Sequence, residues 1–273
     1  MRWLDRFGLF ERFAERRCLA VRELAIGLTD LPASFHGLRI GHFSDLHLGH
    51  YHDLEDLRRL VNRLRSLQPD MICFTGDLVD TDVACLEEAI PLLAALRPPL
   101  GKYAVLGNHD YRAGVDGVTR ALVQSGFRLL RNSHVRVRRG ADELVVAGLD
   151  DALYGRPDVA AALHWVPEGS CVVLLVHEPD VADQASAHPV SLQLSGHTHG
   201  GQVRLPLVGH LLTPQLGKKY PDGWQRVKNA SLQVYTSRGV GTTLLPVRLW
   251  CPPEIALLTL QLASEERNGI SAG

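Results

Sequence analysis

The chain has 273 residues, of which 45% are hydrophobic and 22% are charged, and its formal net charge is -1. This balance is that of an ordinary globular protein, and the small net charge argues against a nucleic-acid binder that works by bulk electrostatics. The five cysteines lie far apart without CxxC spacing, which predicts reduced thiols and argues against a thiolate zinc site. The 13 histidines cluster along the chain.

The N-terminal segment carries no predicted membrane span or secretory signal, because charged residues interrupt every apolar run. The expected location is therefore the cytoplasm. Residues 1–30 are predicted to form a helix, with Trp3, Phe7 and Phe10 on one face and arginines elsewhere. The preferred interpretation is a helix packed on the domain. The alternative is an in-plane helix that contacts the inner face of the membrane.

From residue 37 the chain alternates between short apolar runs and amphipathic segments. The predicted helices are Leu54–Leu67, Val83–Leu96 and Val115–Ser125. The predicted strands are Leu38–Phe43, Met71–Thr75, Tyr103–Leu106, Leu144–Gly148, Val172–Val176, Leu192–Ser195, Val234–Ser237 and Ile255–Leu260. This order predicts an α/β sandwich of layers. We expect a helical extension over residues 1–36, the main domain over 37–263 and a flexible tail over 264–273.

Five of the predicted strands end at an Asp, Asn or His. The motifs that follow them are SDLH (44–47), GDLVD (76–80), GNHD (107–110), HEP (177–179) and GHTH (196–199). Ligand sites in open α/β sheets form at the carboxyl ends of strands, so these side chains are candidate ligands. Oxygen and imidazole donors without thiolate favour Mn²⁺, Fe²⁺, Zn²⁺ or Mg²⁺. Seven donors are too many for one tetrahedral ion and enough for two ions that share a carboxylate.

In this order the five motifs resemble the calcineurin-like metallophosphoesterase superfamily. The resemblance implies a four-layer α/β/β/α sandwich of two mixed sheets, with two divalent metal ions at the carboxyl ends of the strands. It implies that Asp45, His47 and His199 bind the first ion, that Asn108, His177 and His197 bind the second, and that Asp77 bridges them. His109 resembles the family's non-ligand histidine, which contacts the phosphate and can protonate the leaving group.

Two carboxylates next to these ligands are predicted to act indirectly. Asp110 follows His109 and is expected to orient its imidazole, and Asp80 is expected to have a supporting role rather than to bind metal. A metal-bridging water would attack the phosphorus, so no protein nucleophile is needed. The absence of a GxSxG motif agrees with this mechanism.

The wider sequence resembles the small stand-alone bacterial phosphodiesterase branch of the superfamily. The resemblance covers about residues 24–262 and includes GHTHGGQVRLP (196–206), YTSRGVGT (235–242) and LPVR (245–248). Members of the branch often begin with a twin-arginine signal or a membrane anchor. Here Arg16 and Arg17 have no apolar stretch behind them, so export is not expected. Arg238 and Arg204 are candidate phosphate-binding residues, with solvated surface charges as the alternative.

Three functions are compatible with these patterns. The first is hydrolysis of a phosphate ester, above all a phosphodiester, with manganese as one candidate metal. The second is hydrolysis of a lipid-linked diphosphate such as a UDP-diacylglucosamine, with residues 1–30 at the membrane surface. The third is a non-catalytic metal-binding platform, against which the complete ligand set argues. Nucleic acid is not an expected partner.

Overall fold

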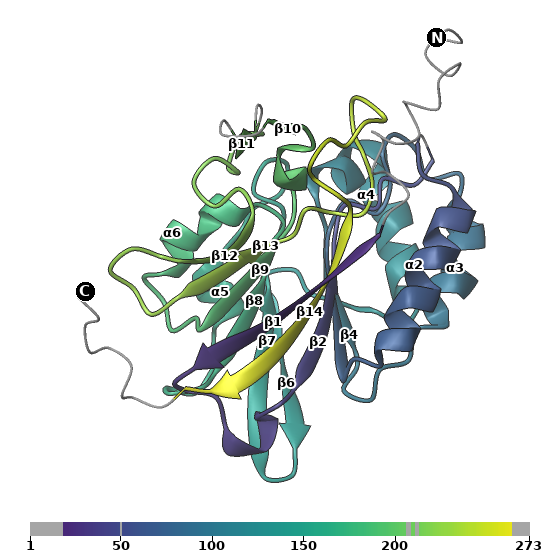
Figure 1. Ribbon diagram of the computed structural model, residues 1–273. Helices are drawn as coiled ribbons and strands as arrows, with labels where there is room; N and C mark the ends of the chain where they lie inside the picture. The colour runs from purple at the N-terminus through teal and green to yellow at the C-terminus, as the bar shows by residue number, and fades with distance from the viewer. Residues whose placement is uncertain (1–18, 50, 206–208, 211–212, 264–273) are drawn as a thin grey trace, which may run out of the picture.

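The computed structural model describes residues 19–49, 51–205, 209–210 and 213–263. Two six-stranded mixed sheets pack face to face, and helices cover the outer face of each (Figure 1). The expected four-layer α/β/β/α sandwich is therefore confirmed. Within the described ranges, no helix is long and apolar enough to cross a membrane.

The first sheet has the strand order β1-β14-β2-β3-β4-β5. Strands β2 to β5 are parallel, β14 is antiparallel to β2, and β1 is parallel to β14. Three helices cover its outer face: α2 (Leu54–Leu67), α3 (Leu86–Ala94) and α4 (Asn108–Gln124). The strands are β1 (Ala20–Leu28), β2 (Arg39–Phe43), β3 (Met71–Thr75), β4 (Lys102–Val105), β5 (Arg128–Leu129) and β14 (Glu254–Leu262).

The second sheet has the strand order β12-β13-β9-β8-β7-β6. Its four central strands are parallel, and the two edge strands run antiparallel to them. The short helices α5 (Val159–Ala162) and α6 (Ala182–Ala185) pack on its outer face. The strands are β6 (Ser133–Arg139), β7 (Asp142–Gly148), β8 (Val172–Leu175), β9 (Leu192–Ser195), β12 (Gly223–Arg226) and β13 (Gln233–Thr236).

Shorter elements complete the described chain. A two-stranded hairpin, β10 (Arg204–Leu205) and β11 (Gly209–His210), stands apart from both sheets (Figure 1). The 3-10 helices are η3 (Ala33–Phe35), η4 (Pro179–Val181) and η5 (His199–Gly201). The four cysteines of the described ranges are free thiols, as expected.

The strands are buried on both faces, and their side chains alternate between two cores. In β3, Met71 and Cys73 point into the core between the sheets, whereas Ile72 and Phe74 point toward the helices. This double burial explains why the strand sequences read as continuous apolar runs. At roughly 25 cal/mol per Å² of apolar surface, the three cores supply the main stabilising term of the fold.

The helix expected over residues 1–30 is wrong for Ala20–Leu28, which form strand β1. Ile26 and Leu28 are buried there while Ala25 and Gly27 are exposed, a period-two pattern that a helix cannot produce. Residues 1–18 lie outside the described ranges, so the remainder of that prediction is untested. The division at residue 37 and the tail over 264–273 stay predictions, although β1 belongs to the first sheet.

The eight predicted strands are confirmed, with ends that differ by a few residues. Helix α3 begins later than predicted, at Leu86, and α4 begins seven residues earlier, at Asn108. Gly114, with a φ of 139°, interrupts α4 and divides it into an N-terminal turn and an amphipathic helix. The second part corresponds to the predicted helix Val115–Ser125. That N-terminal turn carries three of the candidate site residues.

Candidate metal centre

All seven predicted ligands lie within a few residues of the carboxyl ends of strands. Asp45 and His47 follow β2, Asp77 follows β3, and Asn108 follows β4 in the first sheet. His177 follows β8, and His197 and His199 follow β9 in the second sheet. Because these strands are parallel within each sheet, their ends meet at one edge of the sandwich, and all seven side chains are buried there.

Five of the seven residues have a left-handed backbone, which non-glycine residues seldom adopt. The φ angles are 53° at Asp45, 48° at His47, 59° at Asp77, 72° at His197 and 51° at His199. Such conformations cost of order 1–3 kcal/mol each and persist only where the surrounding structure enforces them. This concentration of strain at five buried polar residues marks the edge as a functional site.

Glycines before three of the ligands allow the close approach of neighbouring segments. A Cβ atom on Gly196 would lie 1.9 Å from Ser44 Oγ, and one on Gly107 would lie 2.3 Å from Asp77 Oδ1. Both distances are far below a van der Waals contact, so a larger residue at position 196 would push the two sheet ends apart, and one at position 107 would displace Asp77.

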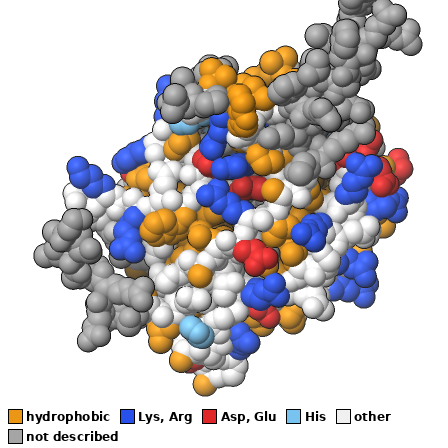
Figure 2. Space-filling view, viewed as in Figure 1, with side chains coloured by type: hydrophobic (Ala, Val, Ile, Leu, Met, Phe, Trp, Pro, Cys, Tyr) orange, Lys and Arg blue, Asp and Glu red, His pale blue; other side chains and the backbone are white. Residues whose placement is uncertain are grey.

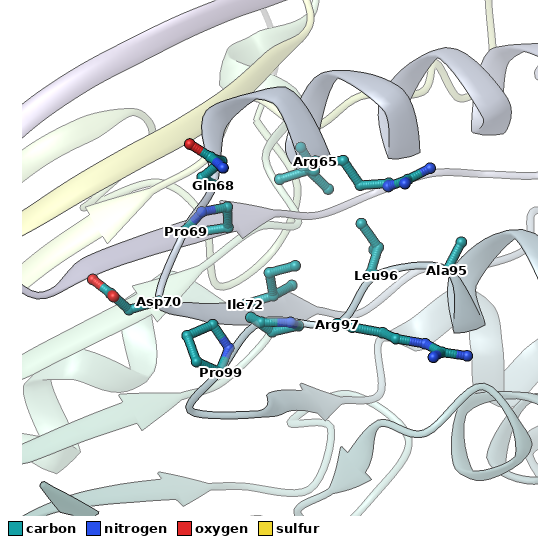
Figure 3. A pocket seen from close by; sticks show the side chains of 11 residues that line it. Arg65, Gln68, Pro69, Asp70, Ile72, Ala95, Leu96, Arg97 and Pro99 are labelled. Atoms are coloured by element: carbon teal, nitrogen blue, oxygen red, sulfur yellow. The ribbon is translucent and has the colours of Figure 1, made fainter.

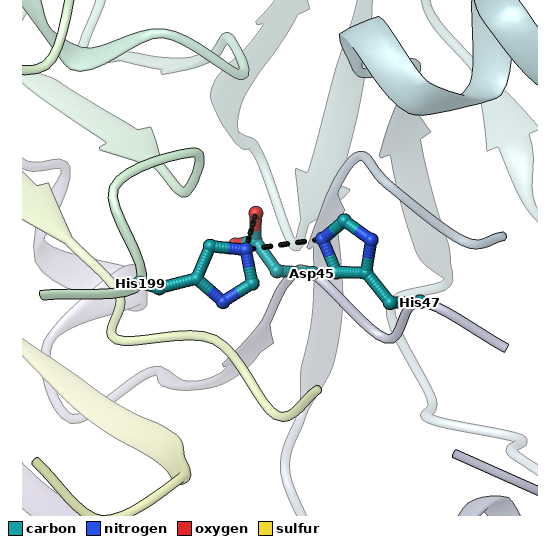
Figure 4. A group of neighbouring side chains, drawn as sticks. All are labelled: Asp45, His47 and His199. Carbon is teal, nitrogen blue, oxygen red and sulfur yellow. Dashed lines mark hydrogen bonds and ion pairs between the residues drawn. The ribbon is translucent and has the colours of Figure 1, made fainter. Parts of the chain in front are cut away.

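The first cluster consists of Asp45, His47 and His199 (Figure 4). The Nε2 atoms of His47 and His199 are 3.0 Å apart, and His199 Nε2 is 3.6 Å from Asp45 Oδ1. The three donor atoms converge on one point from two different sheets. This arrangement matches the expected ligands of the first ion.

The second cluster is formed by Asn108, His177 and His197 together with Asp77. Asn108 Oδ1 lies 3.2 Å from His177 Nε2 and 3.1 Å from His197 Nδ1. His177 Nε2 is also 3.2 Å from Asp77 Oδ2. His177 thus faces an amide oxygen and a carboxylate oxygen with the same nitrogen, which is the geometry of groups gathered around a cation.

Asp77 lies between the two clusters. The same oxygen that approaches His177 is 3.5 Å from His47 Nε2 of the first cluster, while Asp77 Oδ1 accepts a hydrogen bond from the His109 amide at 2.8 Å. Burial alone would raise the pKa of Asp77, but the charges of His177 and His47 hold it below its usual range. The carboxylate is therefore ionised and available to both clusters.

Of the four histidines among the candidate ligands, His197 and His199 are neutral. Burial lowers the pKa of His197 to about 4, and the neighbouring His177 lowers it further in the same direction. Burial, followed by the charges of His47 and Arg248, also lowers the pKa of His199. A neutral imidazole keeps a free lone pair, which is the form that binds a metal ion. His47 and His177, whose pKa the neighbouring carboxylates raise in spite of burial, would release a proton when a metal ion binds.

Asp80 connects His47 to His109. Its Oδ1 atom lies 3.0 Å from His47 Nδ1 and 3.3 Å from His109 Nδ1, and its backbone oxygen is 2.9 Å from the same His109 nitrogen. His109 is half-buried, and its ring packs edge-on against His47 at 4.6 Å between centroids. Asp80 thus orients one ligand and the candidate acid, which agrees with the supporting role expected for it.

The orienting contact expected between Asp110 and the His109 ring is absent, and that prediction is wrong. Asp110 instead accepts hydrogen bonds from the backbone N–H groups of Asp77, Leu78, Val79 and Gly107 at 2.7–3.3 Å. A carboxylate at the start of α4 is well placed for such bonds, since the helix dipole also favours it. Asp110 therefore holds the Asp77 turn in place, and Asp80 holds the imidazole.

Arg204 and Arg238 pair with a carboxylate that belongs to neither cluster. Both guanidinium groups bind Asp222, Arg204 through Nη2 at 2.7 Å and Arg238 through Nε at 2.8 Å. Both side chains lie close to Gly200, the residue that follows His199: a Cβ atom there would be 3.0 Å from Arg238 Cγ and 3.4 Å from Arg204 Nη2. Their predicted phosphate contact is not tested by this geometry, which shows them occupied by one carboxylate.

Sequence reasoning missed Arg248, a fully buried arginine beside His199. Its guanidinium donates to the backbone oxygens of Gly241, Arg238 and Cys251 at 2.5–3.1 Å, and Nη2 lies 3.3 Å from His199 Nδ1. Burial lowers its pKa, yet an arginine stays charged under all ordinary conditions. No sequence signal distinguishes this residue from a surface arginine, since the bonds join segments with irregular backbone.

A surface hollow lies elsewhere, at the opposite end of β3 (Figure 3). It has a volume of about 510 Å³ and is lined by residues that include Arg65, Asp70, Leu96 and Arg97. None of the clusters of metal-binding groups in the described ranges includes a residue of this hollow. The chemistry of the protein is therefore concentrated at the carboxyl ends of the strands.

Comparison with known proteins agrees with this geometry. The family model of calcineurin-like phosphoesterases matches residues 38–201, which include all seven candidate ligands. The chain is 38% identical to the uncharacterised metallophosphoesterase YkuE of Bacillus subtilis, over 92% of this chain and 89% of that protein. It is 35% identical to an uncharacterised metallophosphoesterase of Aquifex aeolicus, over 89% of this chain and 92% of the other.

Among solved structures, the fold is similar to that of the Thermus thermophilus protein TT1561, with a TM-score of 0.50 and 16% sequence identity. The match covers 74% of this chain and 89% of that one. At this identity the likeness concerns the fold alone.

Proposed function

Because the chain belongs to the calcineurin-like phosphoesterase family, whose members use divalent metals to hydrolyse phosphoric esters, we propose that it is a dinuclear phosphodiesterase. The observation that carries the proposal is the position of Asp77, whose Oδ2 atom lies within 3.5 Å of one histidine from each cluster. A carboxylate shared in this way is what two adjacent ions require. The cytoplasmic location stays a prediction.

The donor set fits two hard-to-borderline divalent ions. Asp45, His47 and His199 would hold the first, Asn108, His177 and His197 would hold the second, and Asp77 would belong to both. The oxygen and imidazole donors suit Mn²⁺, Fe²⁺, Zn²⁺ or Mg²⁺, and we propose manganese as the first ion to test. When bound, such a pair supplies an activated water and neutralises charge on the phosphoryl oxygens.

The protein's own contribution is to orient and to transfer a proton. Asp80 accepts from the Nδ1 side of both His47 and His109, so each ring would present its Nε2 atom to the centre. We propose His109 as the general acid that protonates the leaving oxygen, since it is the one half-buried histidine among these buried ligands.

The test uses the full chain loaded with Mn²⁺ on bis(p-nitrophenyl) phosphate, on p-nitrophenyl phosphate and on a lipid-linked diphosphate. We expect the diester to be cleaved fastest, with about two ions bound per chain by metal analysis. Asp77→Asn should abolish cleavage, whereas Asp82→Asn, an exposed carboxylate nearby, should not. Two bound ions without hydrolysis of any of the three substrates would leave the metal-binding platform as the function.

The role of His109 is tested with aryl diesters whose leaving groups differ in pKa. A general acid matters most for poor leaving groups, so His109→Ala should slow these esters much more than activated ones. Equal slowing across the series would show that His109 binds the phosphate without transferring a proton.

A lipid-linked diphosphate is the second candidate substrate. The sequence-based argument for it depends on residues 1–30, of which 1–18 lie outside the described ranges. A separate observation favours it: large apolar side chains are exposed beside the metal centre.

A further inference from the structure

Four large apolar side chains are exposed on two segments that are hydrogen-bonded to each other near His199. Leu244 is 85% exposed, Leu245 62%, Trp250 51% and Leu205 38%. They come from hairpin strand β10 and from loop 242–250, and we call this set the apolar lip. Figure 2 shows hydrophobic side chains gathered at the top of the molecule, around these two segments.

Hydrogen bonds join the two segments of the lip to each other, next to His199. Gln202 Nε2 donates to the backbone oxygens of Thr243 at 3.1 Å and Leu245 at 2.8 Å. The Leu249 amide donates to Gln202 O at 3.1 Å, and Val203 forms a β-bridge with Leu249. Gln202 directly follows the η5 helix that begins at His199, so the lip borders the first metal-binding cluster.

Arg248 fixes the base of the lip. Its guanidinium is buried and binds the backbone oxygens of Gly241 and Cys251, which lie on either side of Leu244 and Leu245 in sequence. Leu244 also has a left-handed backbone, with a φ of 62°. The leucines are therefore held out into solvent by a buried anchor and a defined turn, rather than left there by a loosely packed loop.

Basic residues surround the lip's base with an excess of positive charge. Arg22, Arg204 and Arg238 share the carboxylate of Asp222, at 3.8, 2.7 and 2.8 Å, and Arg238 Nε also lies 3.7 Å from Glu254 Oε2. Three guanidinium groups therefore face two carboxylates, and the second of these, Glu254, is buried. In Figure 2, Lys and Arg side chains lie directly below the apolar lip.

We propose that the apolar lip docks on an anionic lipid bilayer, with Leu244 and Leu245 in the acyl region and the arginine cluster at the lipid phosphates. Exposed apolar groups bordered by guanidinium groups match the two layers of such a surface, apolar within and anionic outside. The docked orientation brings the metal centre to the membrane surface. The docking stands independently, whereas its consequence, a substrate carried by the bilayer, rests on the proposed function.

Vesicle flotation with the full chain tests the docking. Wild-type protein should float with vesicles that contain phosphatidylglycerol, more weakly with pure phosphatidylcholine, and less as the salt concentration rises. The L244S/L245S variant should bind at least about tenfold more weakly, because it removes two large apolar groups from the contact. Trp165→Ser is the matched control. Trp165 is 79% exposed, but it follows α5, on the outer face of the second sheet, and does not belong to the apolar lip.

Three results would overturn the docking proposal. Wild-type protein that does not float with anionic vesicles has no such surface. Unchanged flotation of L244S/L245S, with loss in a full-chain W3S/F7S/F10S variant, would assign membrane contact to the N-terminal segment instead. A wild-type dimer that the leucine substitutions convert to a monomer would show that the lip pairs with a second copy.

The same variants separate this proposal from the proposed function. Cleavage of soluble bis(p-nitrophenyl) phosphate should be unchanged in L244S/L245S, because no lip residue belongs to the metal-binding clusters. Failure of the wild type on the soluble diester would contradict the enzymatic proposal and leave the docking result standing. Loss of activity on the lipid diphosphate alone in L244S/L245S would support both.

Discussion

The core between the sheets and the metal centre at their edge are built from the same strands, yet they follow opposite rules. Within β9, Leu192 and Leu194 are buried among aliphatic neighbours in regular backbone. Three and five residues after Leu194, His197 and His199 are also buried but polar, with left-handed backbone. One region gains stability from apolar burial, and the other holds buried charge and strain that its surroundings must support.

Because the two regions differ in this way, we expect stability and function to respond separately to substitutions along one strand. Changes in the core should alter the free energy of unfolding without altering the chemistry of the folded fraction. Changes at the edge should alter metal binding and turnover while leaving the folded state intact. The predictions below test this separation.

The largest effect on stability is expected from Leu194→Ala. This fully buried side chain packs between the sheets, so its truncation should lower the free energy of unfolding by about 2–5 kcal/mol. Urea unfolding measures the loss, and Leu262→Ala, at a 48% exposed position, is the control with little change expected. A much lower kcat per folded molecule in Leu194→Ala would contradict the separation.

The largest effect on function is expected from Asp77→Asn. Loss of the shared carboxylate should reduce kcat by more than about 100-fold. Removal of a group that only orients a metal ligand usually lowers activity by about 10–100-fold. Asp70→Asn should retain activity, because Asp70 lies at the other end of β3, away from the metal centre, where it accepts a hydrogen bond from the Arg39 amide. The pair compares the two ends of one strand, and similar activities in both variants would contradict the assignment of Asp77.

A smaller loss is expected from Asp80→Asn. The amide keeps an oxygen near the Nδ1 atoms of His47 and His109 but loses the charge, so metal affinity or turnover should fall by roughly 10–100-fold. Calorimetric titration of Mn²⁺ into metal-free protein gives the affinity independently of activity. Affinity and turnover at the wild-type level would show that Asp80 only packs beside the site.

The smallest effect is a pH dependence that belongs to the fold and not to the metal centre. Burial lowers the pKa of Lys102 from 10.5 to about 8, and its ammonium donates to Leu93 O at 2.8 Å. The unfolded chain then binds more protons than the folded one between these values, so stability should rise with pH from about 8 to 10.5. Lys102→Met should remove this rise in urea unfolding measured at pH 7.5 and pH 10.

The sequence predicted the layers and the edge at which the candidate ligands gather, because both depend on local signals. Strands buried on both faces give apolar runs, and polar residues directly after such runs indicate a shared edge. The helix prediction was wrong at Ala20–Leu28. The helical spacing of Trp3 and Phe7 had been extended into this segment, whose side chains alternate between buried and exposed as in a strand. A strand that pairs only with β14 has no partner nearby in sequence that could reveal it.

Contacts between distant segments were also beyond the sequence. Asp110 was expected to orient the neighbouring His109, but it binds backbone amides across the site, and Asp80 orients the imidazole. Arg248 looked like any other arginine until the fold placed it under His199. In both cases the controlling interaction joins irregular loops, whose conformation no periodic pattern encodes.

The pairing of β1 with β14 has a consequence for the order of folding during synthesis. Strand β14 lies between β1 and β2, and it is the last strand of the described chain to leave the ribosome. Until then β1 has no neighbour to bind, and the adjacent edge of β2 stays open to solvent. We therefore expect the nascent chain to expose an unpaired strand edge late in translation, when binding by a chaperone would best prevent aggregation.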